Sequence, residues 1–193
     1  GKTTTVTPSS PKTTPVMEPN GTFLGRADAP VQIIEFSSLT CTHCAHFHND
    51  ILDEFRVKYI DTGLVRLEFR SFPLNKPALD ATLLLNCLPK DRYFPFMSML
   101  YQTQDHWAFS NEYMTSLKQN AKLAGLSDTG IDTCLNDKGA VEKLATQIKT
   151  DAEKYKLEST PTFIINDGKT RVNGALPVSE FAKEIDPLLP QNP

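Results

Sequence analysis

The pattern of apolar and polar positions first becomes regular between residues 31 and 69. Residues 31–37 form an apolar run rich in Val, Ile and Phe, which predicts a buried strand. The next segment repeats an apolar residue at every fourth position, which predicts one face of a helix. These positions are Phe47, Ile51, Phe55 and Tyr59. Residues 64–69 then alternate between apolar and polar side chains and predict a second strand, so the whole segment predicts a βαβ unit with parallel strands.

The rest of the chain divides into a helical middle and a β-containing end. Residues 75–155 show no strand pattern and predict a series of helices. These helices span residues 78–88, 93–104, 111–124 and 140–155, with a short one around Cys134. Two strands, at residues 162–165 and 170–172, are joined by a predicted hairpin turn at Asn166-Asp167-Gly168. A helix over residues 178–189 closes the chain.

The order of these elements is βαβ, a helical insertion, and ββα. It predicts an α/β fold with a mixed sheet and helices on both of its faces. We expect the sheet domain to comprise residues 21–74 and 156–193, and the inserted helical domain to comprise residues 75–155. Residues 1–20 are rich in Thr and Pro and poor in apolar side chains, so they predict a flexible tail.

The net charge and the lengths of the apolar runs exclude several classes of function. The 193 residues carry a net charge of −3, which argues against a nucleic-acid partner or a membrane-surface role that depends on bulk charge. No run approaches the roughly 18 apolar residues of a membrane-spanning helix, and no signal peptide is visible. We therefore expect a processed form, whose tail is the remnant of a removed signal peptide or the tether of a membrane anchor.

The sequence Cys41-Thr42-His43-Cys44 carries the clearest chemistry. It follows a predicted strand and opens a predicted helix, where unpaired N–H groups and the helix dipole stabilise a thiolate. We expect Cys41, at the edge of the helix, to be the exposed nucleophile and Cys44, one turn inside, to be the buried resolving partner. His43 lies between them, where a partial positive charge would favour the Cys41 thiolate. The motif predicts a thiol–disulfide redox protein.

The other cysteines and the histidines leave alternatives open. Cys87 and Cys134 are either two buried free thiols or a disulfide, which would contribute at most about 4 kcal/mol and place the protein outside the reducing cytosol. His48 could share a helical face with Cys41 and Cys44, as a zinc site requires. No second Cys/His cluster accompanies them or the nearby His46, so no metal is expected, and we expect His106 to be a packed or surface residue rather than a ligand.

Three motifs identify a family. Residues 35–37 (Glu-Phe-Ser) precede the CxxC, residues 69–73 (Phe-Arg-Ser-Phe-Pro) follow the helix, and residues 159–163 (Ser-Thr-Pro-Thr-Phe) precede the last two strands. Together with the βαβ–ββα order, they resemble the thioredoxin fold. The inserted helical domain resembles the DsbA-like branch of that superfamily, over residues 22–189.

The resemblance implies roles for particular residues. Glu35 would be a buried carboxylate that relays a proton to Cys44, whereas its pattern alone also allows a solvent-facing place on an edge strand. The Thr160–Pro161 bond would be cis, with the Thr160 backbone pairing with an extended substrate; the alternative is an ordinary proline at the start of a strand. The pair of Cys87 and Cys134 is similar to the second, structural disulfide of some α-proteobacterial members.

The resemblance also implies a function. It indicates a monomeric, periplasmic or otherwise extracytoplasmic thiol:disulfide oxidase that acts on reduced, unfolded or exported proteins and needs no cofactor. A membrane quinone-linked partner similar to DsbB would reoxidise it. Two residues depart from the pattern, because Thr42 replaces Pro and Thr160 replaces Val. A disulfide isomerase or reductase, or a non-catalytic chaperone or binding module, therefore remains an alternative.

Overall fold

The computed structural model describes residues 16–18 and 21–191 and contains one mixed sheet of six strands. The strands lie in the order β1-β2-β4-β3-β5-β6, and only β3 and β4 are parallel. Their bounds are β1 (Val16–Glu18), β2 (Gly21–Leu24), β3 (Val31–Ser37), β4 (Val65–Ser71), β5 (Thr162–Ile165) and β6 (Thr170–Asn173). The predicted βαβ unit and closing hairpin are confirmed.

The first two strands were not predicted. β1 pairs antiparallel with β2, which in turn pairs with the edge of β4. Within the predicted tail of residues 1–20, the structure describes the strand Val16–Glu18, while residues 1–15 and 19–20 lie outside the described residues. Both strands are shorter than the window in which alternation is recognisable, so pairing with a neighbouring strand rather than sequence pattern determines them, β2 with β4 and β1 with β2.

The helix after β3 is continuous but varies in pitch. It runs through α1 (Thr42–His46), a π-helical turn η1 (Phe47–Ile51), α2 (Leu52–Phe55) and a second π-helical turn η2 (Arg56–Ile60). An apolar period of four residues is longer than the 3.6 residues of an α-helical turn, so the stripe would drift around a regular helix. The wider π turns remove that drift. All four predicted core positions of this helix are accordingly buried.

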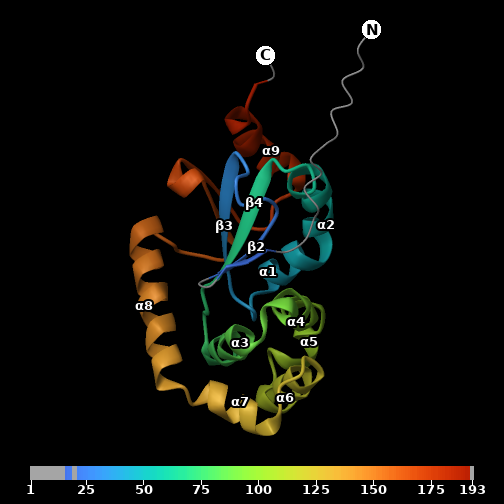
Figure 1. The fold of residues 1–193 in the computed structure, drawn as a ribbon, viewed down its shortest axis with the longest axis vertical. Helices are drawn as coiled ribbons and strands as arrows, with labels where there is room; N and C mark the ends of the chain where they lie inside the picture. Colours follow the sequence, from blue (N-terminus) through green and yellow to red (C-terminus); the bar gives the residue numbers. More distant parts are fainter. Residues whose placement is uncertain (1–15, 19–20, 192–193) are drawn as a thin grey trace.

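The inserted segment is entirely helical, as predicted. Its helices are α3 (Lys76–Cys87), α4 (Lys90–Gln102), α5 (Gln104–Trp107), α6 (Tyr113–Leu123), α7 (Asp128–Leu135) and α8 (Lys138–Tyr155). Figure 1 shows α3 to α7 gathered at one end of the molecule, with α8 running back along the side of the sheet. The chain closes with α9 (Val178–Ile185) and a 3-10 turn, η4 (Asp186–Leu188).

Both faces of the sheet are covered. On one face, Phe163 of β5 packs against Phe47 of η1 and Phe181 of α9, with ring centroids 4.7 and 4.8 Å apart. On the other face, Phe36 of β3 contacts Tyr155 of α8 at 5.5 Å. The α/β fold class with helices on both faces is therefore confirmed.

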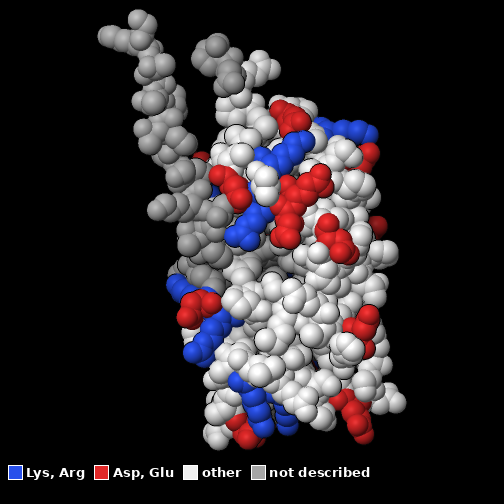
Figure 2. Space-filling model, turned by 90° about the vertical axis from the view of Figure 1, so that its right-hand side faces the viewer, with Lys and Arg blue, Asp and Glu red and all other residues white. Residues whose placement is uncertain are grey.

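Charged side chains are unevenly distributed on the side of the molecule formed by α2 and α4 to α6. Figure 2 shows that Lys and Arg on this side stand beside Asp and Glu toward both ends of the molecule, and that the centre carries few charges. This mixture agrees with the small net charge of −3. Within residues 16–18 and 21–191, no helix is both long and apolar enough to cross a membrane.

Candidate active site

Cys41 lies at the N-cap of α1, where the end of β3 turns into the helix. The backbone N–H of Cys44 donates to Cys41 Sγ over 3.3 Å. The pKa of Cys41 is lowered to about 5, chiefly by the hydrogen bond from the Cys44 side chain; burial opposes this, while Thr160 and the backbone N–H groups of Cys44 and His43 support it. A thiol in these surroundings is a thiolate at neutral pH.

Cys44 lies in the opposite environment, because it is fully buried in α1. Its pKa is raised far above the usual range, first by burial and then by the Cys41 side chain beside it, with a smaller contribution from the charge of Glu35. The pKa values of the two cysteines therefore differ in the direction that their sequence positions predicted. Cys41 is a half-buried thiolate and Cys44 is a buried thiol.

His43 is exposed, and its contribution to the low pKa of Cys41 comes from its backbone N–H. This is the helix-terminus effect expected of any residue at that position. The expected role of the imidazole charge stays a prediction.

A second loop meets Cys41 from a distant part of the sequence. The Thr160–Pro161 peptide bond is cis, and Cys41 Sγ lies 3.5 Å from Thr160 O. Pro161 O accepts the N–H of Gly174 over 2.8 Å, which joins this loop to the end of β6. The structure thus brings Cys41, Thr160 and Pro161 together, with Pro161 directly before β5, and the substrate-pairing role expected of Thr160 stays a prediction.

Glu35 is fully buried in the central strand β3, so the alternative of a solvent-facing edge position is wrong. One carboxylate oxygen, Oε2, lies 2.8 Å from His48 Nε2. The other, Oε1, is buried and has no hydrogen-bond partner. The carboxylate is therefore hydrogen-bonded through one oxygen, while its other oxygen has no partner.

His48 packs inside the protein next to this carboxylate. Its ring stacks on Tyr101 of α4 with a centroid separation of 4.3 Å, and the Tyr101 hydroxyl donates to Ser37 Oγ over 3.0 Å. His48 Nε2 is engaged by Glu35. Among residues 16–18 and 21–191, no three His, Cys, Asp or Glu side chains lie close enough together to hold a metal ion.

Two residues of the inserted segment hold the chain before the nucleophile, and the sequence did not indicate either. The buried Gln104 side chain donates from Nε2 to Leu39 O over 2.9 Å and to Cys41 O over 3.0 Å. Thr40 Oγ1 donates to Asn75 Oδ1 over 3.1 Å. Gln104 begins the short helix α5, which is also stabilised by Trp107 Nε1 donating to Leu100 O over 2.8 Å.

The remaining two cysteines form a disulfide in the structure. Cys87 ends α3 and Cys134 lies in α7, and their Cα atoms are 6.2 Å apart. The bond therefore joins two helices of the inserted segment and leaves Cys41 and Cys44 as the free thiol pair.

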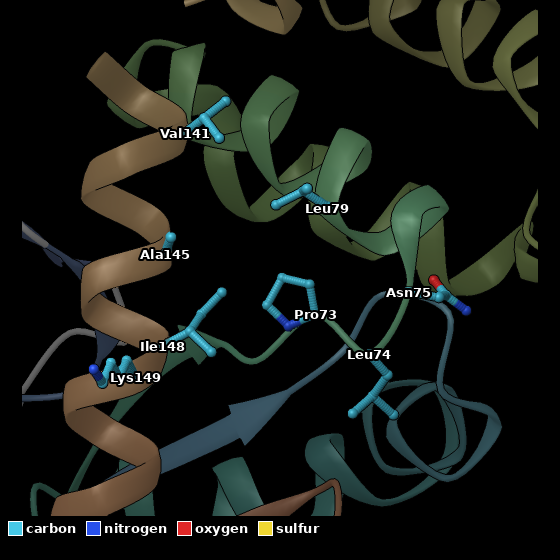
Figure 3. Close-up of a pocket in the computed structure, with 8 residues that line it drawn as sticks. All are labelled: Pro73, Leu74, Asn75, Leu79, Val141, Ala145, Ile148 and Lys149. Atoms are coloured by element: carbon cyan, nitrogen blue, oxygen red, sulfur yellow. The ribbon is translucent and has the colours of Figure 1, made fainter. Parts of the chain in front are cut away.

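A groove with a volume of about 410 Å³ lies beside the segment that leads to Cys41. Figure 3 shows that side chains of α8 form one wall, with α3 and the loop after β4 opposite. Its lining is mainly apolar and comprises Pro73, Leu74, Asn75, Leu79, Val141, Ala145, Ile148 and Lys149. Leu74 N–H donates to Ser38 Oγ over 3.3 Å, so the groove and the nucleophile's loop are physically connected.

Comparison with known proteins adds independent support for the fold and chemistry. A family model described as Thioredoxin matches residues 17–187. A Rickettsia typhi protein named among the protein-disulfide oxidoreductases is 33% identical over 160 residues, which cover 82% of this chain and 59% of that protein. Disulfide bond formation protein D of Bacillus subtilis is 26% identical over 155 residues, covering 75% of this chain and 67% of that protein.

Solved structures agree. Wolbachia pipientis alpha-DsbA1 is 33% identical and superposes with a TM-score of 0.79 over 90% of this chain and 92% of that one. Oxidised BdbD of Bacillus subtilis, at 23% identity, a TM-score of 0.73 and coverage of 86% and 91%, shows the fold alone. The chain spans about three fifths of the length of the first curated relatives it matches.

Proposed function

Because this chain belongs to the thioredoxin family, in its DsbA-like branch, we propose that it is a thiol:disulfide oxidase that introduces disulfide bonds into exported proteins. The observation that carries the proposal is the contrast between Cys41, whose pKa is about 5, and the buried Cys44, whose pKa is raised far above the usual range. Stabilising the Cys41 thiolate favours the dithiol form, so the Cys41–Cys44 disulfide is a strong oxidant. DsbA itself is a known case of this relation, so the direction of the effect is the one expected for this branch.

The reaction is a two-step exchange. A substrate thiolate attacks Cys41 Sγ and expels Cys44 as a thiolate, which forms a mixed disulfide and breaks the Cys41–Cys44 bond. A second substrate thiolate then attacks the substrate sulfur of the mixed disulfide and releases the Cys41 thiolate, a good leaving group because of its low pKa. The substrate loses two electrons and the protein gains them, while Glu35 supplies the proton that the buried Cys44 takes up.

Reduced, unfolded polypeptides are the proposed substrates. Thr160 O lies 3.5 Å from Cys41 Sγ, so an extended chain that paired with the Thr160 backbone would pass directly over the nucleophile. Backbone pairing of this kind reads no particular side chain, which suits a protein with many clients.

The reduced form must be reoxidised, and a membrane quinone-linked protein similar to DsbB is the proposed partner. An extracytoplasmic location is supported by the Cys87–Cys134 disulfide, since such bonds persist in oxidising compartments. The proposed tether falls on a tail most of which lies outside the described residues.

The test is the reduction potential of Cys41–Cys44, measured in glutathione buffers. A Cys87→Ala/Cys134→Ala variant serves as the control in which only one pair titrates. A potential more oxidising than that of protein disulfide isomerase, about −180 mV, is expected. A value near that of thioredoxin, about −270 mV, would instead indicate a reductant and overturn the proposal.

A Cys41→Ser variant separates the enzyme from a binding module. Exchange of disulfides should be lost in this variant, because the other cysteines among the described residues are buried or held in the second disulfide. If the variant still promoted client folding as well as the natural protein does, a chaperone function would replace the proposed one.

A further inference from the structure

The two groups that must exchange a proton in this site are both sealed from solvent. Cys44 and Glu35 each have no exposed surface. When Cys44 is expelled, its thiolate is left in surroundings that strongly disfavour the charge, so it takes up a proton at once. Glu35 is the nearby buried acid, yet after giving up one proton it has no direct access to water from which to regain another.

His48 provides the missing connection. Its Nε2 lies 2.8 Å from Glu35 Oε2, and its side chain is 5% exposed, in contrast to the 0% of Glu35. The two nitrogens of an imidazole allow a proton to enter the ring on one side and leave from the other. His48 is therefore bonded to the buried carboxylate and also reaches the surface.

The ring is held in a defined orientation. It stacks on Tyr101 with an interplanar angle of 13° and contacts Phe47 and Phe69 at centroid distances of 5.4 and 5.2 Å. Three aromatic contacts leave the ring little freedom, so Nε2 remains directed at Glu35. This packing also fixes the Glu35 carboxylate, whose second oxygen, Oε1, has no other partner.

The other titratable groups of this cluster do not replace His48. Tyr101 in α4 has a pKa raised well above its usual value, first by burial, so it stays protonated. Cys41 at the N-cap of α1 and Cys44 within it carry the reacting sulfurs themselves. The neighbours of Glu35 on β4 and β5 are Phe69 and Phe163, which carry no charge.

We propose that His48 is a positioning residue that holds Glu35 and returns protons between it and solvent. The inference rests on the proposed exchange chemistry of Cys41 and Cys44. During reduction of the disulfide, Cys44 takes a proton from the Glu35 carboxyl, Glu35 takes one from the His48 imidazolium, and His48 takes one from water. During reoxidation, the same proton travels outward.

The experiment measures the rate constants of exchange between Cys41–Cys44 and glutathione, in both directions and across pH, for His48→Gln and His48→Phe. The Gln variant keeps a hydrogen bond to Glu35 without passing a proton, and the Phe variant keeps the aromatic packing. Both are expected to slow exchange at least tenfold near neutral pH and to change the shape of the pH profile as Glu35→Gln does. A His48→Gln/Glu35→Gln double variant is expected to add no further loss, because the two residues act in series.

His46→Gln is the matched control. His46 lies two residues earlier on the same helix but is exposed and bonds Asp50 at 2.9 Å, so its replacement is expected to leave the pH profile unchanged. The proposal is overturned if the His48 variants keep the natural pH profile, or if their losses add to that of Glu35→Gln. The equilibrium potential is a separate readout: a reducing value refutes the oxidase function, while the pH profile still decides the role of His48.

Discussion

Cys41 and Cys44 are separated by two residues and one helical turn, and this small displacement gives them opposite protonation. Cys41 receives N–H groups at the helix N-terminus, whereas Cys44 is enclosed by the core. Position in the sequence was enough to predict this difference, because a CxxC that follows a strand and opens a helix has its first cysteine at the N-cap. The partner of Glu35 was not predictable, because the contact with His48 depends on how the helix packs against β3.

The low pKa of Cys41 predicts an unusual pH dependence of its reactivity. In the reduced protein, alkylation of Cys41 by iodoacetamide should stay near its maximal rate at pH 7 and fall to half at about pH 5. An ordinary cysteine would reach half of its maximal rate only at about pH 8.5.

The same shift determines how pH affects the reduced fold. Because the folded pKa is depressed, the stabilisation from Cys41 is complete above the pKa of the unfolded thiol and is lost as pH falls through about 5. The reduced form should therefore lose stability relative to the oxidised form over this range, as measured by urea unfolding. An alkylation midpoint above pH 8 would contradict both expectations.

At the scale of elements, α8 is attached to the sheet through a partly buried charge cluster. Arg70 of β4 bonds Glu68 on its own strand over 2.5 Å and Asp151 of α8 over 3.0 Å. The pKa of Asp151 is nevertheless raised, because burial outweighs the attraction of Arg70. Arg70 therefore neutralises two carboxylates, and its removal is not equivalent to the removal of Asp151 alone.

Substitutions of Arg70 and of Asp151 should therefore change the free energy of unfolding by different amounts. Arg70→Met should lower the free energy of unfolding by about 2 kcal/mol at pH 7, since it leaves Asp151 without its cation and Glu68 with Arg66 alone. Asp151→Asn should change it by less than about 1 kcal/mol. Since the folded pKa of Asp151 is raised, its ionisation opposes folding as pH rises above the usual value, and the Asn variant removes that contribution. Equal losses in urea titrations of both variants would contradict this account.

The disulfide between α3 and α7 is the second interaction that holds elements together. It closes a loop between residues 47 apart, so a Cys87→Ala/Cys134→Ala variant should lose about 2 to 4 kcal/mol of unfolding free energy. Urea unfolding of the variant, compared with the oxidised natural protein, gives the measurement. An unchanged midpoint would mean that the reduced loop is already restrained by packing.

Long periodic elements were predictable and short ones were not. The helices that became α3, α4, α6 and α8 each show more than two turns of pattern, which is enough to recognise them. Helix α5 has only four residues directly after α4, so its pattern merges with the preceding helix, and Gln104 was missed with it. The strands β1 and β2 were missed because pairing, of β2 with β4 and of β1 with β2, forms them rather than their own pattern.

At the scale of the whole molecule, the inserted helices and the sheet meet at the segment before the nucleophile. Three side chains of the insertion form hydrogen bonds to this segment. The Tyr101 hydroxyl bonds Ser37, and the Gln104 amide bonds the carbonyls of Leu39 and Cys41. Asn75 accepts a hydrogen bond from Thr40. One hydrophobic core also runs through both parts, from Phe163 of the sheet to Ile131 of α7. The insertion is therefore part of the same packed body as the redox site.

A shared core predicts a single cooperative unfolding transition. In calorimetry of the oxidised protein, the calorimetric enthalpy should equal the van't Hoff enthalpy. Two separated heat-absorption peaks would show instead that the inserted helices and the sheet unfold independently.

The position of Trp107 makes the redox site observable by fluorescence. It is the chain's only tryptophan, is fully buried, and lies on α5 three residues after the glutamine that bonds the Cys41 carbonyl. Intrinsic fluorescence excited at the indole band therefore comes from one emitter shielded from water. The spectrum of the unlabelled protein reports the surroundings of a single side chain close to the thiols, so stopped-flow emission can follow each turnover without an added dye.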